Sequence, residues 1–244
     1  MKGIILAGGM GTRMLPLTKI TNKHLLPVYD KPMIYYPIQI LVNVGIDDIM
    51  IVTGGTGAGD FLRLLGNGKE FGLKHLNYTY QEGAGGIAAA LALTEHFADD
   101  DSIVLILGDN VIEKNIIKGV RDFENQKRGA KIYLKEVKNP QSYGIAELKG
   151  DKVVGIEEKP ENPRSSLAVI GIYIYDSRVY DIVRTLKPSG RGELEITDVN
   201  NAYIKEGTMT SEVLEGWWGD CGESFDSMLD TANLIAETGA NNID

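Results

Sequence analysis

Residues 2–13 read KGIILAGGMGTR, a short apolar run that enters a glycine-rich turn and ends on an arginine. An apolar run of this length is typical of a strand buried in a parallel sheet. Glycines permit a tight turn and bring bare backbone N–H groups close to an anion, and the Arg13 guanidinium adds donors suited to phosphate. This stretch therefore predicts a buried strand followed by a turn that can bind phosphate.

Apolar runs and helical patterns alternate in the first half of the chain. Strands are expected at 4–7, 49–53, 76–80 and 103–107, and helices at 32–44, 60–65 and 87–97. Pro32 suits the first turn of a helix, because its missing N–H would be unpaired there. Alternation of this kind predicts a mostly parallel sheet with helices on both faces and ligands at the carboxyl ends of the strands. The opening turn, the 81–86 loop and Asp109 all follow such ends.

The second half of the chain has a different pattern. Strands are expected at 131–137, 144–148, 153–157 and 168–175, and helices at 114–126, 177–185, 196–205 and 223–237. Strands that follow one another with little helix between them predict a small antiparallel lobe that continues the same sheet. The expected fold class is α/β, with three layers (α/β/α) and a mixed, mainly parallel central sheet.

The composition argues against several classes of protein. The formal net charge is −9 and no long Lys/Arg run is present, so we expect no nucleic-acid or membrane partner. Cys221 is the sole cysteine, which excludes an internal disulfide and fits a reducing compartment, the cytoplasm. The apolar runs are too short for a signal-peptide core or a membrane span. One cysteine and three scattered histidines also argue against a zinc site.

Two common phosphate-binding motifs are incomplete in the opening turn. The Walker A pattern needs a later Gly-Lys-Ser/Thr, which nothing after Gly8 supplies. The dinucleotide pattern begins with Gly9-x-Gly11, but Met14 stands where its third glycine belongs. The second strand also ends without an acidic residue that could bind a ribose hydroxyl. An NAD(P)-dependent oxidoreductase is therefore disfavoured.

A longer series of motifs is more specific than the turn alone. In chain order these are 6–13 with Pro16 and Thr18, Lys23 with Leu26 and Pro27, 29–37, 107–110, Tyr143-Gly144, 157–160, 171–173 and 191–198. Their order and spacing resemble the nucleotidyltransferases that make sugar nucleotides, in particular the glucose-1-phosphate thymidylyltransferase family. The resemblance implies a Rossmann-like nucleotide-diphospho-sugar transferase fold. It also implies one domain over 1–244, with a nucleotide-binding half at 1–112 and a sugar-phosphate-binding half at 113–244.

The reaction that this resemblance implies joins a nucleoside triphosphate to a sugar 1-phosphate. Glucose 1-phosphate would attack the α-phosphorus of dTTP in line, assisted by Mg²⁺, to give dTDP-glucose and pyrophosphate. The attacking phosphate is already ionised near neutral pH (second pKa roughly 6), so no general base is required. Two alternatives stay open: the same reaction with UTP, and a sugar-nucleotide-binding regulator that has lost catalysis.

The resemblance assigns catalytic roles to four residues and metal binding to two. Arg13 would bind the triphosphate and stabilise the departing pyrophosphate, and Lys23 would contact the phosphates near the reacting centre. Lys159 would hold the sugar phosphate, although a surface ion pair with Glu157 is its simpler explanation. Asp109 would bind Mg²⁺ together with Asp220, since Mg²⁺ prefers one or two carboxylates plus phosphate oxygens.

The remaining residues divide between the two substrates. The nucleotide would contact Leu6, Gly8, Gly9, Gly11, Thr12, Arg13, Gln81, Gly86 and Asp109, and the sugar phosphate Tyr143, Gly144, Glu158, Lys159, Val169, Tyr173 and Arg191. The Gln81 amide complements the imide edge of thymine or uracil, and Gly86 would let the base approach the backbone. Tyr143 and Tyr173 could equally be strand packing residues.

Three departures from the family pattern affect the expectations. Residues 86–90 read GIAAA where the family has a glycine-leucine-alanine-glutamine run, and Cys221 replaces a threonine. We interpret Cys221 as a small residue that fills the same space. Long members continue beyond the last matched helix with a regulatory extension, so the sequence predicts a short form that lacks it. A homo-oligomer, either a dimer or a tetramer, is expected.

Overall fold

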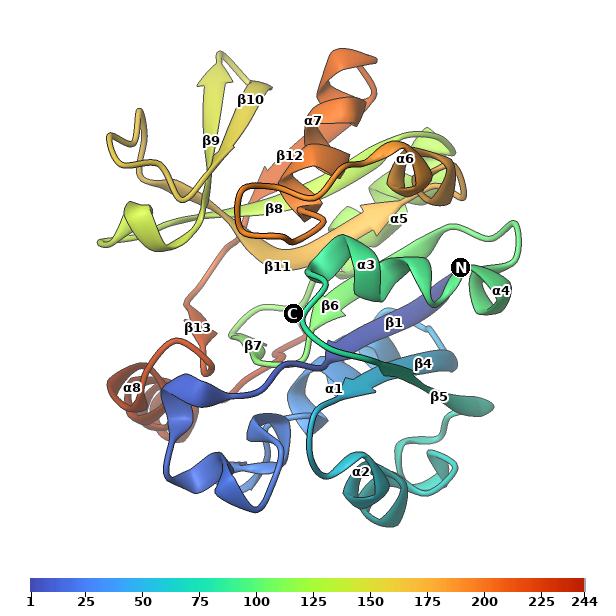
Figure 1. Ribbon diagram of the computed structural model, residues 1–244, viewed down its shortest axis with the longest axis vertical. Coiled ribbons are helices and arrows are strands. Elements are labelled where there is room, and N and C mark those ends of the chain that lie inside the picture. The colour runs from blue at the N-terminus through green and yellow to red at the C-terminus, as the bar shows by residue number, and fades with distance from the viewer. Residues whose placement is uncertain (244) are drawn as a thin grey trace.

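Strand β1 (Lys2–Ala7) lies between two parallel neighbours in the computed structural model, which describes residues 1–243. Its neighbours are β4 (Asp48–Gly54) and β6 (Ile103–Leu107), and β5 (His75–Gln81) pairs with β4. These four strands are mutually parallel and form one side of a nine-stranded sheet (Figure 1). Because they are parallel, the segments that follow β1, β5 and β6 emerge at one edge.

Strand β11 (Leu167–Tyr175) joins this parallel side to the antiparallel lobe. Its end pairs with β6, and its start pairs with β9 (Gly144–Lys149), beyond the point where β6 ends. The β9–β10 hairpin, completed by β10 (Lys152–Glu158), projects away from the parallel strands (Figure 1). On its other side β11 pairs with β8 (Ala130–Glu136), which is parallel to β12 (Met209–Val213). The lobe thus begins beside the carboxyl end of β6.

Helices cover both faces of the sheet, as the alternating pattern predicts. One buried cluster contains α3 (Ile87–Ala92), α4 (Glu95–Ala98), α6 (Val179–Thr185) and α7 (Ile196–Lys205). The cluster on the opposite face contains α1 (Tyr35–Asn43), α2 (Ala58–Leu65) and α5 (Ile117–Gln126). Alternate residues of β1 face each cluster, Ile4 and Leu6 one way and Ile5 and Ala7 the other. The three-layer prediction is confirmed.

Two small sheets and α8 (Phe225–Thr238) lie outside these layers (Figure 1). Strand β7 (Asn110–Ile112) pairs antiparallel with β13 (Trp218–Asp220), and β2 (Pro27–Val28) pairs with β3 (Lys31–Pro32). The short 3₁₀ helices are η1 (Thr12–Met14), η2 (Leu17–Lys19), η3 (Lys23–Leu25), η4 (Lys69–Phe71) and η5 (Pro140–Ser142). The β7–β13 pair joins two segments that are far apart in the sequence. Strand β7 follows β6, and β13 precedes α8.

Two expectations for the helices are wrong. Pro32 does not begin a helix, because it belongs to β3 and α1 starts at Tyr35. The single helix expected at 87–97 is divided into α3 and α4. The Thr94 hydroxyl lies 2.7 Å from the Leu91 carbonyl and 3.0 Å from the Tyr180 hydroxyl, and this local side-chain bonding competes with regular helix.

Every predicted strand forms, but β2, β3, β7, β12 and β13 were not expected. No helix within residues 1–243 is both long enough and apolar enough to cross a membrane.

Candidate active site

A cavity of about 430 Å³ opens where β1, β5 and β6 end. Every residue predicted to bind the nucleotide lines it: Leu6, Gly8, Gly9, Gly11, Thr12, Arg13, Gln81, Gly86 and Asp109. Lys23 also lines it, together with residues that the sequence did not single out, such as His24 and Gly222. We call this space the nucleotide-side cavity.

The opening turn leaves its arginine available. Gly9 and Gly11 have φ of +92° and +60°, a region that side chains other than glycine rarely adopt. The Thr18 hydroxyl donates to the Gly11 carbonyl (2.8 Å) and fixes the turn. The exposed Arg13 side chain has no hydrogen bond or ion pair to any residue between 1 and 243. Its guanidinium therefore stands in the cavity as an unneutralised cation.

Gln81 ties the 81–86 loop to the opening turn. Its Nε2 donates to the Gly86 carbonyl (3.1 Å), and its Oε1 would lie 3.2 Å from a Cβ added to Gly8. The structure explains the glycine at position 86 by a contact other than the expected approach of the base. A Cβ there would lie 2.6 Å from the Leu194 carbonyl oxygen, so Gly86 permits close packing against 193–194 as well as lining the cavity.

A second cavity of about 390 Å³ lies between the end of β6 and the antiparallel lobe. Every residue predicted to bind the sugar phosphate lines it: Tyr143, Gly144, Glu158, Lys159, Val169, Tyr173 and Arg191. We call it the sugar-side cavity. The two cavities adjoin, because both are lined by Arg13, Ile87, Leu107 and Glu193.

Some charged groups of the sugar-side cavity are already paired with other protein groups. Glu158 accepts from the Thr197 hydroxyl (2.6 Å) and from Arg191 (3.3 Å), and Arg191 also pairs with Glu195 (2.8 Å). Burial alone would raise the pKa of Glu195, but hydrogen bonds from Arg191 and Ser189 lower it. Arg191 is therefore neutralised by carboxylates, which weakens its case as a phosphate ligand.

Lys159 is free of the ion pair that its sequence neighbours suggested. Among residues 1–243 its ammonium has no salt bridge to Glu157 or to any other carboxylate. Its backbone N–H donates to the Tyr143 carbonyl (3.0 Å), and its φ of +46° turns the chain sharply after β10. The exposed side chain lines the sugar-side cavity as a second available cation.

Lys23 and Asp109 form an ion pair of 2.5 Å at the inner end of the nucleotide-side cavity. Burial alone would raise the pKa of Asp109, but the Lys23 ammonium, with help from Asn110, holds it at about 2. Burial would lower the pKa of Lys23, and the Asp109 carboxylate outweighs this and raises it. Both groups are therefore charged near neutral pH.

The β7–β13 pair brings Asp220 beside Asp109. Asp220 is in register with Asn110, and the Cys221 N–H donates to the Asp109 carbonyl (2.9 Å). Burial and the Asp109 charge raise the pKa of Asp220 to about 7. A Cβ on Gly222 would collide with Asp109 Oδ2 and lie 2.6 Å from Lys23 Nζ, so a larger residue there would displace the pair.

These carboxylates suit a cation that brings most of its own ligands. No cluster of three or more His, Cys, Asp or Glu side chains able to hold a metal occurs in the part of the chain that the structure describes. Two carboxylates whose mutual repulsion raises a pKa would be relieved by a divalent cation, and Mg²⁺ completes its shell with water and phosphate oxygens. The buried Cys221 thiol has its pKa raised to about 12 by burial, as expected for a space-filling residue.

Sequence reasoning missed several residues of these cavities: His24, Glu195, Thr197, Trp218 and Glu223. His24 directly follows the predicted Lys23, and Glu195 and Thr197 lie in the 191–198 motif, which was the available signal. Asn22 donates to the Ala7 and Gly54 carbonyls, so its Oδ1 faces His24 Nδ1 (2.7 Å). Burial and the neighbouring Lys23 charge lower the pKa of His24 to about 3, and the ring is neutral.

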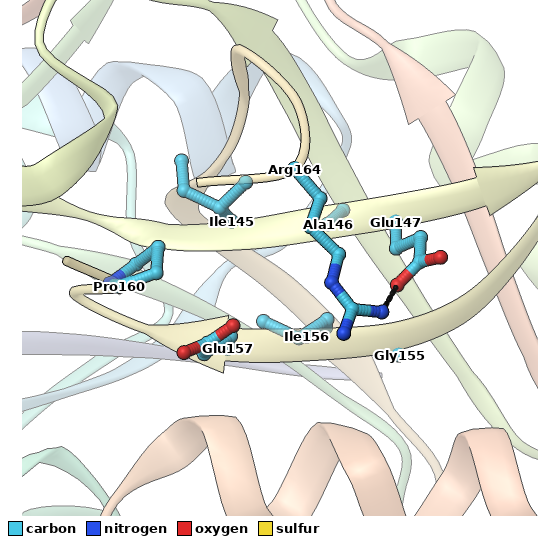
Figure 2. Close-up of a pocket in the computed structure, with 8 residues that line it drawn as sticks. All are labelled: Ile145, Ala146, Glu147, Gly155, Ile156, Glu157, Pro160 and Arg164. Atoms are coloured by element: carbon cyan, nitrogen blue, oxygen red, sulfur yellow. Dashed lines mark hydrogen bonds and ion pairs between the residues drawn. The ribbon is translucent and has the colours of Figure 1, made fainter. Parts of the chain in front are cut away.

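A third cavity, of about 200 Å³, lies on the β9–β10 hairpin and contains no predicted site residue (Figure 2). Arg164 extends across the hairpin and donates to Glu147 (3.0 Å), so the one arginine that lines this cavity is already paired with a carboxylate (Figure 2). The two adjoining cavities remain the candidate active site.

Comparison with known proteins agrees with this geometry. Residues 2–238 match the family model described as nucleotidyl transferase. A glucose-1-phosphate thymidylyltransferase of Mycolicibacterium smegmatis is 45% identical over 96% of this chain and 82% of its own length. The chain belongs to the nucleotidyl transferase family. Within that family, the resemblance to glucose-1-phosphate thymidylyltransferases that the motifs predicted is confirmed.

Solved structures support the same assignment. A provisionally assigned glucose-1-phosphate thymidylyltransferase from Bacillus anthracis, crystallised with sucrose, has a TM-score of 0.92 and 48% identity, and the match covers 100% of this chain and 97% of that one. A UDP-glucose pyrophosphorylase crystallised with UDP-glucose has a TM-score of 0.82 and 25% identity, covering 97% and 98%. The predicted fold class is confirmed.

Proposed function

We propose that this protein transfers a deoxythymidylyl group from dTTP to glucose 1-phosphate, forming dTDP-glucose and pyrophosphate. The observation that carries the proposal is the junction of the two cavities. Arg13 lines both, Lys23 and Asp109 lie in one, and Asp220 and Lys159 line the other. Two anionic substrates bound in these cavities would meet where the cations and carboxylates converge.

The nucleotide-side cavity supplies the groups that a thymidine triphosphate needs. Bare N–H groups of the opening turn and the Arg13 guanidinium would bind the phosphates. The Gln81 amide offers both an acceptor and donors to the imide edge of the base. To do so it would exchange or share its present bond with the Gly86 carbonyl.

The sugar-side cavity supplies acceptors for hydroxyls and a cation for phosphate. Glu158, already oriented by Thr197, would accept from sugar hydroxyls, and Lys159 would bind the phosphate. The buried Tyr173 and Val169 and the half-buried Tyr143 would enclose the ring. Arg191 would position Glu158 and Glu195 and would not bind the phosphate itself, because its guanidinium is ion-paired with both carboxylates.

The chemistry that follows is an in-line displacement. A phosphate oxygen of glucose 1-phosphate forms a bond to the α-phosphorus while the bond from that phosphorus to the bridging oxygen breaks. The electron pair leaves with pyrophosphate, whose charge Arg13 and Lys23 would stabilise. No proton is transferred, because the attacking phosphate is ionised (second pKa roughly 6). Alignment of two repelling anions is the main task of the site.

Asp109 and Asp220 would hold Mg²⁺. When bound, this ion neutralises charge on the phosphates. The chain's own contribution is to keep Asp109 ionised through Lys23 and to bring Asp220 to it through the β7–β13 pair.

A substrate panel tests the proposal. The protein would be incubated with Mg²⁺, with dTTP, UTP, ATP or GTP, and with several sugar 1-phosphates, and pyrophosphate measured. We expect release with dTTP and glucose 1-phosphate. UTP is the second candidate, because a UDP-glucose pyrophosphorylase shares this fold and one methyl group discriminates by only about 1–3 kcal/mol. Preference for a purine would refute the role of Gln81, and no release from any pair would favour a sugar-nucleotide-binding regulator.

We also propose one nucleotidyltransferase domain over 1–244 in which the halves at 1–112 and 113–244 share the site. Glu193 and Gly222 of the second half line the nucleotide-side cavity, and Arg13 of the first lines the sugar-side cavity. A homo-oligomeric state and, from the lone cysteine, a cytoplasmic location remain part of the proposal. Sedimentation velocity would measure the oligomeric state.

A further inference from the structure

A single carboxylate connects two distant segments across the wall of the sugar-side cavity. Glu223 lies in the turn between β13 and α8. Its Oε2 accepts from the Tyr143 hydroxyl (2.5 Å), and its Oε1 accepts from Asn139 Nδ2. Asn139 and Tyr143 flank η5, which leads into β9. Glu223 therefore fastens the start of the antiparallel lobe to the turn that carries Asp220.

Both ends of this connection reach the candidate catalytic groups. The Glu223 N–H donates to the Asp220 carbonyl (3.3 Å), three residues earlier in the chain. At the other end, the Tyr143 carbonyl accepts from the Lys159 N–H (3.0 Å). Displacement of Tyr143 would therefore displace the backbone of the lysine proposed to bind the sugar phosphate.

The Tyr143 ring is held from a second side. It packs edge-on against Trp218, with ring centroids 5.5 Å apart, and Trp218 Nε1 donates to Asn110 Oδ1 (2.7 Å). Asn110 Nδ2 in turn donates to Asp109 Oδ1 (3.1 Å). With Glu223 bound to its hydroxyl, Tyr143 is fixed in relation to both aspartates.

We propose that Glu223 is a positioning residue for the sugar phosphate, acting through Tyr143. It sets the separation between the lobe and the Asp109–Asp220 cluster. A carboxylate on this wall repels an anionic substrate, which is unfavourable unless its hydrogen bonds are needed. Both of its oxygens accept such bonds from the lobe. This inference rests on the proposed function.

Kinetics of Glu223→Ala, Glu223→Gln, Tyr143→Phe and the Glu223→Ala/Tyr143→Phe double variant test it. We expect the KM for glucose 1-phosphate to rise about tenfold in Glu223→Ala and Tyr143→Phe, the size of a lost hydrogen bond to a charged group. The KM for dTTP should stay within about twofold, since Glu223 does not line the nucleotide-side cavity. Glu223→Gln keeps an acceptor for Tyr143 and should recover most of the loss. The double variant should resemble either single variant.

Tyr35→Phe is the matched control, because it removes a tyrosine–glutamate hydrogen bond (to Glu70, 3.3 Å) that lies outside both cavities. It should leave both KM values unchanged. If Glu223 acted by charge alone, Glu223→Ala and Glu223→Gln would lower the KM for glucose 1-phosphate and Tyr143→Phe would resemble wild type. Equal rises in both KM values would indicate general loosening. Either result would overturn the proposal.

Hydrogen exchange separates this inference from the proposed function. Amides at 139–145 should exchange faster in Glu223→Ala and Tyr143→Phe than in wild type, whether or not the wild type turns over any substrate. Unchanged exchange would refute the connection itself. Absence of turnover with altered exchange would refute only the proposed reaction.

Discussion

Lys23 Nζ and Asp109 Oδ2 lie 2.5 Å apart although the two residues are 86 positions apart in the sequence. The pair is partly buried at the junction of η3 with the end of β6. It keeps Asp109 ionised, with a pKa of about 2, despite the burial that would raise it. Asp220, beside the pair, has its pKa raised to about 7 by burial and by Asp109. The ion pair thus keeps Asp109 ionised, whereas burial and the Asp109 charge favour protonation of Asp220.

Asp109→Asn should reduce kcat/KM by about 10²–10³-fold, the size of losing one electrostatic contact to the reacting phosphates. The fold should persist, because asparagine keeps an oxygen that accepts from Lys23. Pyrophosphate release and circular dichroism would measure the two effects. Asp226→Asn, an exposed change in the first turn of α8, is the control and should leave turnover unchanged. Normal turnover in Asp109→Asn would remove Asp109 from the proposed metal site.

Gly222→Ala should lower activity far more than it lowers stability. Its Cβ would lie 2.6 Å from Lys23 Nζ and collide with Asp109, so the ion pair must move. A displacement of about 1 Å at a reacting centre reduces the rate by about 10²-fold. Gly59→Ala is the control, because a Cβ at that position in α2 meets no atom within 4 Å. Equal activities in the two variants would show that the position of the pair is unimportant.

Gly86→Ala should destabilise the protein more than Gly45→Ala. Both glycines have similar φ, +91° and +84°, so both variants are strained by about 1 kcal/mol or more. Only Gly86 has a backbone oxygen in the way, that of Leu194 at 2.6 Å, whereas a Cβ on Gly45 meets nothing within 4 Å. We expect a further loss of about 1–3 kcal/mol for Gly86→Ala in urea unfolding. Indistinguishable midpoints would contradict the close packing of 86 against 194.

Acid should destabilise the protein partly through His24. Its pKa is about 3 in the folded protein, against an ordinary 6.5, because it is buried beside Lys23. Between these pH values His24 is protonated in the unfolded chain and neutral in the folded chain. The free energy of unfolding therefore falls as the pH falls from 6.5 towards 3. From pH 7.5 to pH 5 this contribution is about 2 kcal/mol.

His24→Gln removes this titration and provides the comparison. The stability advantage of wild type over His24→Gln in urea unfolding should shrink by about 2 kcal/mol on going from pH 7.5 to pH 5. A constant difference over that range would mean that His24 is not held neutral.

The sequence predicted most of the fold because its strands are local apolar runs. β1, β4 and β6 are buried on both sides, so their signal needs no information from elsewhere in the chain. β7 and β13 are three residues long and too short to show a period, and they form because they pair with each other. Their pairing is what brings Asp220 to Asp109.

The candidate site was predicted by motif, and its internal bonding was not. The motifs placed Arg191 and Glu158 in one cavity, but the pairing of Arg191 with Glu195 depends on how the 189–195 turn folds back. Gly86 was singled out for the base, whereas its Cβ direction faces Leu194. Glu223 had no signal, because its partners Asn139 and Tyr143 lie 84 and 80 residues away. Contacts between distant polar residues require the three-dimensional arrangement of the chain.

The most direct test of the proposed reaction measures which product receives a radioactive phosphate from dTTP. The protein would be supplied with glucose 1-phosphate, Mg²⁺ and dTTP labelled with ³²P at either the α or the γ position, and the products separated. Attack on the α-phosphorus predicts α-label in dTDP-glucose and γ-label in pyrophosphate. Transfer of γ-label to the sugar, or no labelled product from either substrate, would contradict the proposed nucleotidyl transfer.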